Sequence, residues 1–118
     1  MLTYVTFNIN LNLDTFSLQA ALRADRMDPN CWESLGEAYV SRGSYAAALK
    51  SFRKASELNP DHVYSIYRAA AVEQILGKYE NAIVTYQQIL EKTEEYVPAL
   101  KGNVSVFSIL DLFLSLTL

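Results

Sequence analysis

Cys31 and His62 are the one cysteine and the one histidine of the chain, and a cysteine–histidine pair is a common core of nucleophilic thiolate sites. Such a site also needs a third group that orients the imidazole, and the sequence offers no evident candidate. His62 follows Asn59-Pro60-Asp61 in a predicted turn, where a solvated side chain is the simpler interpretation. We therefore predict no catalytic residue and no enzyme activity.

Glu33 and Glu37 are four residues apart, so both carboxylates lie on one face if this segment is helical. Paired carboxylates can perform acid–base chemistry, but on a repeat helix they more often form a solvated face that meets a partner. The sequence has no glycine-rich phosphate loop and no cysteine–histidine set with zinc spacing. We expect neither a cofactor nor a bound metal ion.

Lys50, Arg53 and Lys54 could form a small basic face that contacts RNA phosphates. The net charge of the chain is −3, whereas nucleic-acid binders usually carry a basic patch or stripe. A solvated outer face is the commoner role for three such residues. Direct nucleic-acid binding is therefore not expected, and weak RNA binding ranks third among the functions considered.

The elements that would position these side chains repeat at an interval of 34 residues. Residues of the same type recur at this interval, among them Ala21 and Ala55, Gly43 and Gly77, Tyr45 and Tyr79, and Ala48 and Ala82. Phe52 and Tyr86, both aromatic, keep the same interval. This period is typical of helix–turn–helix repeats that stack into a solenoid.

Start and stop signals divide each repeat into two helices. Asp28 can cap a helix that begins at Pro29, and Gly43 supplies the left-handed residue that ends it. The proline in Asn59-Pro60-Asp61 ends the second helix. The sequence therefore predicts an all-α fold, with helices over residues 29–42, 45–58, 61–76 and 79–93 and a further helix that starts near residue 96.

The first full unit resembles the tetratricopeptide-repeat (TPR) family at every position of that family's pattern. The matching residues are Trp32, Leu35, Gly36, Tyr39, Gly43, Tyr45, Ala48, Phe52, Ala55 and Pro60. The second unit is degenerate, since Ile66, Ala69, Ala70 and Glu73 stand at its first four positions. The resemblance implies a helix–turn–helix solenoid with one complete repeat, one degenerate repeat and a partial repeat at each end.

The repeat register divides the chain into five segments. These are a non-repeat segment (1–17), the end of a partial repeat (18–28), repeat 1 (29–62), repeat 2 (63–96) and a partial third repeat with a divergent apolar tail (97–118). Residues 5–13 alternate between apolar and polar types, which is the period of a β-strand.

The tail is very apolar from residue 104 onward, but it contains Asp111 and is shorter than a membrane span, so we expect no membrane insertion. We hypothesise that both ends come from a truncated or alternatively spliced product; the alternative is that the tail caps the solenoid. Exposed solenoid ends also predict self-association.

The resemblance places a protein-binding surface, because TPR proteins bind partners in a concave groove lined by the first helix of each repeat. By register, the groove residues are Asn30, Glu33, Glu37, Val40, Tyr64, Tyr67, Ala71 and Gln74, with Arg68 beside them. Tyr64 and Tyr67 can act as aromatic anchors for a partner or can pack against the next repeat. TPR co-chaperones hold carboxylate tails with Lys and Asn where this chain has Glu33 and Glu37, and two acidic residues would repel such a tail.

Residues 20–102 carry a more specific resemblance. The segments CWESLGEAY, ALKSFRKASELNP, QILGKYENA and YVPALKG resemble the large TPR scaffold subunits of superkiller (SKI) complexes. The resemblance implies a non-catalytic fragment of such a scaffold, helicase and WD-repeat protein partners, and a role in exosome-linked 3′-to-5′ mRNA decay. It also implies a cytoplasmic location, with the nucleus as an alternative. The second function hypothesis is a freestanding TPR adaptor that binds peptide segments of other proteins.

Overall fold

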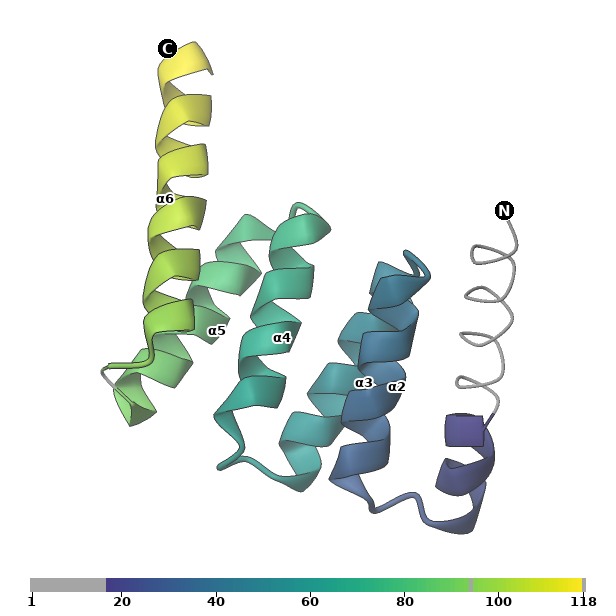
Figure 1. Cartoon of the computed structure of the whole chain (residues 1–118). Coiled ribbons are helices and arrows are strands. Elements are labelled where there is room, and N and C mark those ends of the chain that lie inside the picture. Colours follow the sequence, from purple (N-terminus) through teal and green to yellow (C-terminus); the bar gives the residue numbers. More distant parts are fainter. Residues whose placement is uncertain (1–16, 94, 118) are drawn as a thin grey trace, which may run out of the picture.

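The computed structural model describes residues 17–93 and 95–117, and the regular elements in these ranges are all helices. Residues 17–24 form a helical segment, followed by α2 (Pro29–Ser41), α3 (Tyr45–Leu58), α4 (Val63–Ile75), α5 (Tyr79–Lys92) and α6 (Val97–Thr117). Consecutive helices run antiparallel and stack in one row (Figure 1). The predicted all-α helix–turn–helix solenoid is confirmed. The alternating segment over residues 5–13 lies outside the described residues.

The start of α2 and the turns within the repeats follow from single residues. The Oδ1 atom of Asp28 accepts a hydrogen bond from the backbone N–H of Asn30 at 3.0 Å, which caps α2 as predicted. Gly43 and Gly77 have φ angles of +76° and +78°, a region that residues with a Cβ rarely enter. Each glycine reverses the chain, so that α3 and α5 begin two residues further on.

The start of α4 differs from the prediction of a helix over residues 61–76. The backbone N–H of His62 donates to the carbonyl oxygen of Asn59 at 3.1 Å, which closes a turn over residues 59–62. The helix therefore begins at Val63, and Asp61 and His62 belong to the turn between the repeats.

Two buried clusters hold the stack together. One consists of Ala48, Leu49, Phe52, Ala69 and Val72, and the other of Ala70, Ala82, Tyr86, Ile89, Ala99 and Val106. The alanines let neighbouring helix axes approach, and the aromatic rings fill the wider gaps. Each cluster joins residues of successive repeats, so neither repeat has a core of its own.

Two glycines make room for the aromatic rings of these clusters. A Cβ atom at Gly36 would lie 2.7 Å from Cε1 of Phe52, and a Cβ atom at Gly102 would overlap the ring of Tyr86. Phe52 and Tyr86 occupy the same position of successive repeats. In both places a helix backbone approaches a ring so closely that no larger residue fits without a shift.

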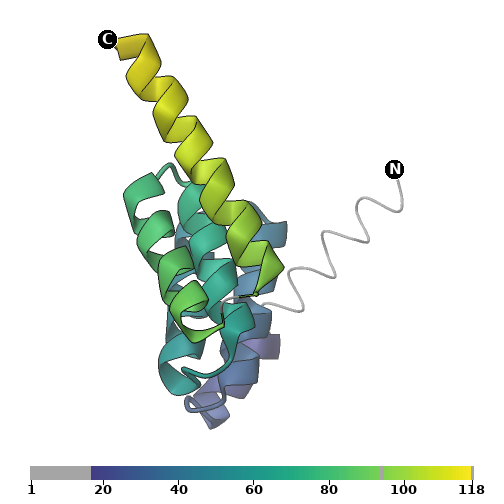
Figure 2. The same ribbon diagram turned by 90° about the vertical axis from the view of Figure 1, so that its left-hand side faces the viewer.

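α6 packs one face against α4 and α5, where Ala99 and Val106 are fully buried. The C-terminal half of α6 extends past the ends of the other helices (Figures 1 and 2). Although α6 is apolar, no helix in the described ranges has the length and hydropathy to cross a membrane. The segment that was predicted to lose the repeat pattern therefore continues the stack as one helix.

Candidate functional site

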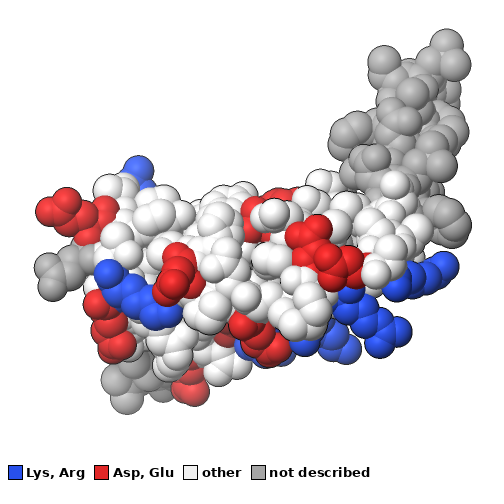
Figure 3. Space-filling model, turned by 90° about the horizontal axis from the view of Figure 1, so that it is seen from below, with Lys and Arg blue, Asp and Glu red and all other residues white. Residues whose placement is uncertain are grey.

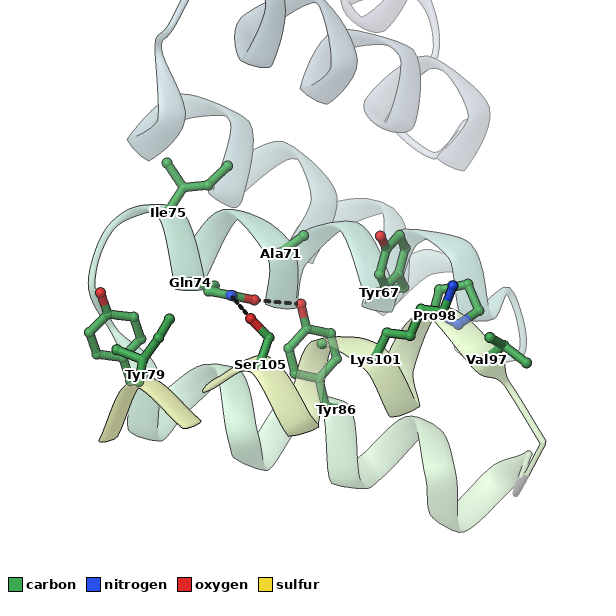
Figure 4. A pocket seen from close by; sticks show the side chains of 12 residues that line it. Tyr67, Ala71, Gln74, Ile75, Tyr79, Tyr86, Val97, Pro98, Lys101 and Ser105 are labelled. Atoms are coloured by element: carbon green, nitrogen blue, oxygen red, sulfur yellow. Dashed lines mark hydrogen bonds between the residues drawn. The ribbon is translucent and has the colours of Figure 1, made fainter. Parts of the chain in front are cut away.

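A groove of about 720 Å³ lies between α4 and α6. Its lining comes from three helices: Tyr67, Ala71, Gln74 and Ile75 of α4, Tyr79 and Tyr86 of α5, and Val97, Pro98, Lys101, Gly102, Ser105 and Ile109 of α6. Gln74, Ser105 and Tyr86 meet at the centre of the groove in Figure 4. Most of these lining side chains are aromatic or aliphatic, and Lys101 is the charged residue among them. The groove can therefore accept an apolar side chain and place an anionic group beside Lys101.

Hydrogen bonds between three helices fix the groove. The Tyr86 hydroxyl donates to Oε1 of Gln74 at 3.1 Å, and Nε2 of Gln74 donates to Oγ of Ser105 at 3.3 Å (Figure 4). Tyr86 is almost fully buried, and this burial raises the pKa of its hydroxyl to about 12. The hydroxyl therefore remains a proton donor at neutral pH, and the groove is formed before any partner arrives.

The two tyrosines predicted as anchors have different roles in the structure. The ring of Tyr67 packs against those of Tyr86 and Tyr96, with centroid separations of 6.3 and 6.0 Å. Tyr64 is 39% exposed, and its ring lies 6.3 Å from that of Tyr67. Tyr67 therefore packs against other rings of the protein, which was one of the two alternatives predicted for it. It also lines the groove.

Glu37 connects α2 to α4. Nε of Arg68 donates to Oε1 of Glu37 at 2.7 Å and Nη2 of Arg68 donates to Oε2 at 3.0 Å, while the Tyr64 hydroxyl donates to Oε1 at 2.9 Å. The guanidinium of Arg68 also lies over the ring of Phe52, at 5.6 Å from its centroid. Three predicted groove residues thus form one network across the repeat boundary.

Glu33 makes a second connection between the repeats. Its Oε2 atom lies 2.8 Å from Nε2 of His62 and accepts a hydrogen bond from the hydroxyl of the buried Ser65. His62 is an exposed turn residue as predicted, and the structure adds that its side chain meets a carboxylate of α2. Glu33 and Glu37 also line a second hollow of about 500 Å³ beside residues 17 and 18.

Cys31 has a carboxylate partner of its own. Its Sγ lies 3.2 Å from Oδ2 of Asp28, and this hydrogen bond, with partial burial, raises the pKa of the thiol above its ordinary value. A raised pKa keeps the sulfur protonated and poorly nucleophilic. Cys31 and His62 therefore bind different carboxylates, Asp28 and Glu33, rather than one another.

The remaining predicted residues lie apart from these networks. Asn30 is exposed in the first turn of α2, whereas Val40 is half-buried against the cluster around Phe52. On the basic face, Arg53 pairs with Glu73 at 3.5 Å and Lys54 pairs with Glu57 at 3.8 Å. Red and blue side chains are interspersed on the face seen in Figure 3, and most of that face is uncharged. These observations do not favour a phosphate-binding surface.

The α6 wall of the groove was not predicted from the sequence. Register could have placed part of this wall, because Lys101 and Ser105 stand one period after the predicted groove positions Tyr67 and Ala71. Ser105 begins a polar stripe at helical spacing with Ser108, Asp111 and Ser115, and this stripe was the available signal for a helix with a polar side.

The comparisons with known proteins agree with this geometry. The tetratricopeptide-repeat family model matches residues 29–62. Superkiller complex protein 3 of Homo sapiens is 68% identical over 85 residues, which are 72% of this chain and 5% of that protein. Superkiller protein 3 of Schizosaccharomyces pombe is 47% identical over 72 residues, which are 61% of this chain and 5% of that protein. The chain thus spans 5% of the length of these curated relatives.

Two solved structures share the fold at low sequence identity. The TPR domain of P58(IPK) superposes with a TM-score of 0.84 at 17% identity, over 96% of this chain and 32% of that one. The first TPR domain of Spaghetti (RPAP3), solved with an HSP90 peptide, gives a TM-score of 0.80 at 19% identity, over 92% and 86%. Likeness at these identities shows the fold alone. Repeat pattern, helix arrangement and family match lead to one conclusion: residues 29–62 form a tetratricopeptide repeat.

Proposed function

We propose that this chain is a non-catalytic piece of scaffold surface from a superkiller-type complex, and that it holds a partner protein in the groove between α4 and α6. The observation that carries the proposal is the groove itself: about 720 Å³, lined by aromatic and aliphatic side chains, and fixed by the Gln74 hydrogen bonds. A preformed apolar groove with one cation suits an extended peptide segment that presents an apolar side chain next to an acidic one.

The similarity to Superkiller complex protein 3 supports the choice of complex. We propose helicase and WD-repeat subunits of that complex as the partners, a supporting role in exosome-linked 3′-to-5′ mRNA decay, and the cytoplasm as the working compartment. The predicted groove residues on α4 (Tyr64, Tyr67, Arg68 and Gln74) would take part directly. Glu33 and Glu37 would act through the contacts that fix α2 against α4.

A freestanding adaptor that binds peptide segments of other proteins is the alternative, and the carboxylates of repeat 1 disfavour one form of it, a clamp for carboxylate tails. Glu33 and Glu37 occupy the positions where a clamp needs cationic or amide donors, and both already bind donors from α4 or the turn before it. A tail carboxylate placed there would meet two acidic groups and would have to displace existing hydrogen bonds.

The test is a binding titration with purified helicase and WD-repeat subunits, followed by calorimetry or fluorescence anisotropy. Ala71 lies in the groove wall, so Ala71→Glu should abolish binding by filling the groove and introducing a charge. Ala46→Glu is the matched control, because Ala46 is exposed on α3 and away from the groove. Binding to neither subunit, together with binding to carboxylate-terminated peptides, would replace the scaffold proposal with the adaptor.

A further inference from the structure

The outer face of α6 carries a row of exposed apolar side chains. Val97, Leu100, Val104 and Phe107 are 54, 41, 66 and 44% exposed. Their spacing of three, four and three residues is that of the seam along which two helices pair in a coiled coil. We refer to these four residues as the α6 seam. It lies at the end of the helix row, where no other described helix covers it (Figure 1).

The seam occupies the register at which the first helix of a repeat meets the second. Leu100, Val104 and Phe107 stand two periods after Trp32, Gly36 and Tyr39. At Gly36 the neighbouring α3 comes so close that an added Cβ would lie 2.7 Å from the Phe52 ring. Val104 has a branched side chain at this position, so a helix that carries an aromatic ring in the manner of α3 cannot approach as closely. The seam therefore fits a partner helix at the wider separation of a coiled coil.

The charged residues of α6 indicate which helix fits the seam as its partner. Lys101 and Asp111 are the two charged residues between positions 97 and 117, and both side chains are exposed. Within the described ranges neither takes part in an ion pair of the single chain. Asp111 also falls at the next position of the seam spacing, four residues after Phe107. A lone charged residue in such a seam costs stability unless the partner supplies the opposite charge.

In an antiparallel pair of α6 helices, each helix supplies the opposite charge to the other, so that two ion pairs form. If two copies cross near residue 106, Lys101 of each copy lies opposite Asp111 of the other, and Val104 of each lies beside Phe107 of the other. Lys101 and Asp111 are about 15 Å apart along one helix, so both ion pairs form in the same register. A parallel arrangement would place like charges side by side. An antiparallel pair related by a two-fold axis makes each contact twice, which gives the two reciprocal ion pairs.

We propose that α6 is a homodimerisation helix, which pairs with α6 of a second copy through the seam and two reciprocal Lys101–Asp111 ion pairs. The four seam residues belong to the first half of α6, and their exposed side chains leave them open to a second copy. Leu100, Val104 and Phe107 lie outside the groove between α4 and α6, whereas Val97 and Lys101 border both surfaces.

Sedimentation equilibrium of the full chain tests the seam. The wild-type chain should be a dimer, and Val104→Asp should be monomeric, because it places a charge in the middle of the seam. Val84→Asp is the matched control: Val84 is 54% exposed on α5, outside the seam, and this variant should remain dimeric. Circular dichroism of each variant must show unchanged helix content. A monomeric wild-type chain, or equal effects of the two substitutions, would overturn the proposal.

A charge exchange tests the register and separates a specific dimer from a sticky apolar surface. Lys101→Glu and Asp111→Lys should each raise the dimer dissociation constant about tenfold, because each replaces two attractive contacts by two repulsive ones. The double variant restores both pairs with inverted signs and should return the constant to near the wild-type value. Lys50→Glu on α3 is the charge-matched control and should have no effect. A double variant at least as weak as the single ones would rule out the antiparallel register.

Discussion

Arg68 of α4 forms a two-point ion pair with Glu37 of α2, with N–H donors at 2.7 and 3.0 Å from the two carboxylate oxygens. The side chains are 21 and 38% exposed, so the pair is partly shielded from solvent. Its two hydrogen bonds fix the angle between successive repeats as well as their distance. The carboxylate of Glu37, which was predicted to face a partner protein, is therefore bound to the next repeat.

Loss of this pair should weaken the coupling between the repeats. We expect Arg68→Ala to lower the free energy of unfolding by about 1 kcal/mol, near the upper end for partly exposed pairs. Arg68→Lys should recover only part of it, because an ammonium group cannot make the two-point contact. Urea denaturation followed by circular dichroism measures both. A double-mutant cycle with Glu37→Gln should give non-additive effects, and simple additivity would contradict the inferred coupling.

Gly36→Ala should be destabilising, although the same change inside an exposed helix normally stabilises by about 1 kcal/mol. The new Cβ would lie 2.7 Å from the Phe52 ring, and Phe52 is fully buried and cannot move aside freely. We expect a loss of about 1–3 kcal/mol in unfolding free energy, the usual cost of overpacking. Phe52→Leu in the Gly36→Ala background should relieve part of the loss. A stabilised Gly36→Ala variant would show that the two helices are less closely packed.

The stability of the chain should fall at alkaline pH because of Tyr86. Burial raises the pKa of this hydroxyl from about 10 to about 12 in the folded chain. Below pH 10 both states keep the proton and the folded state has its full stability. Between pH 10 and 12 only the unfolded state releases it, so the unfolding free energy declines as the pH rises. Thermal melts across this window measure the decline. Tyr86→Phe should be less stable at neutral pH, where it lacks the bond to Gln74, but should show a shallower alkaline decline.

Cys31 should react slowly with alkylating agents at neutral pH. The hydrogen bond to the Asp28 carboxylate raises the pKa of the thiol, and thiolate is the reactive species. Asp28→Asn removes the charge but keeps a side chain that caps helices equally well. The variant should therefore be alkylated faster at unchanged helix content, as measured by mass spectrometry against time. Equal rates would show that limited access, rather than the carboxylate, protects the sulfur.

Local signals in the sequence were enough to predict the helices and their turns. The 34-residue interval, the cap at Asp28 and the glycines at 43 and 77 are local signals, and the structure places α3 at the predicted Tyr45–Leu58. Such signals act within one turn of a helix, so they can be recognised without knowledge of distant contacts. The start of α4 moved by two residues, because a backbone hydrogen bond between His62 and Asn59 takes precedence over helix propensity there.

Which side chains meet depends on how the repeats pack against one another. The partners of Glu33 and Glu37 come from residues 62–68, about one repeat away, and the groove wall comes from α6. Contacts of this kind depend on the separation and angle between stacked helices, which the packing of Phe52 against Gly36 and Tyr86 against Gly102 sets. A linear pattern does not encode that geometry. Register alone thus identified the repeat and the residues expected to face the groove, and the stacking of the repeats determined their partners.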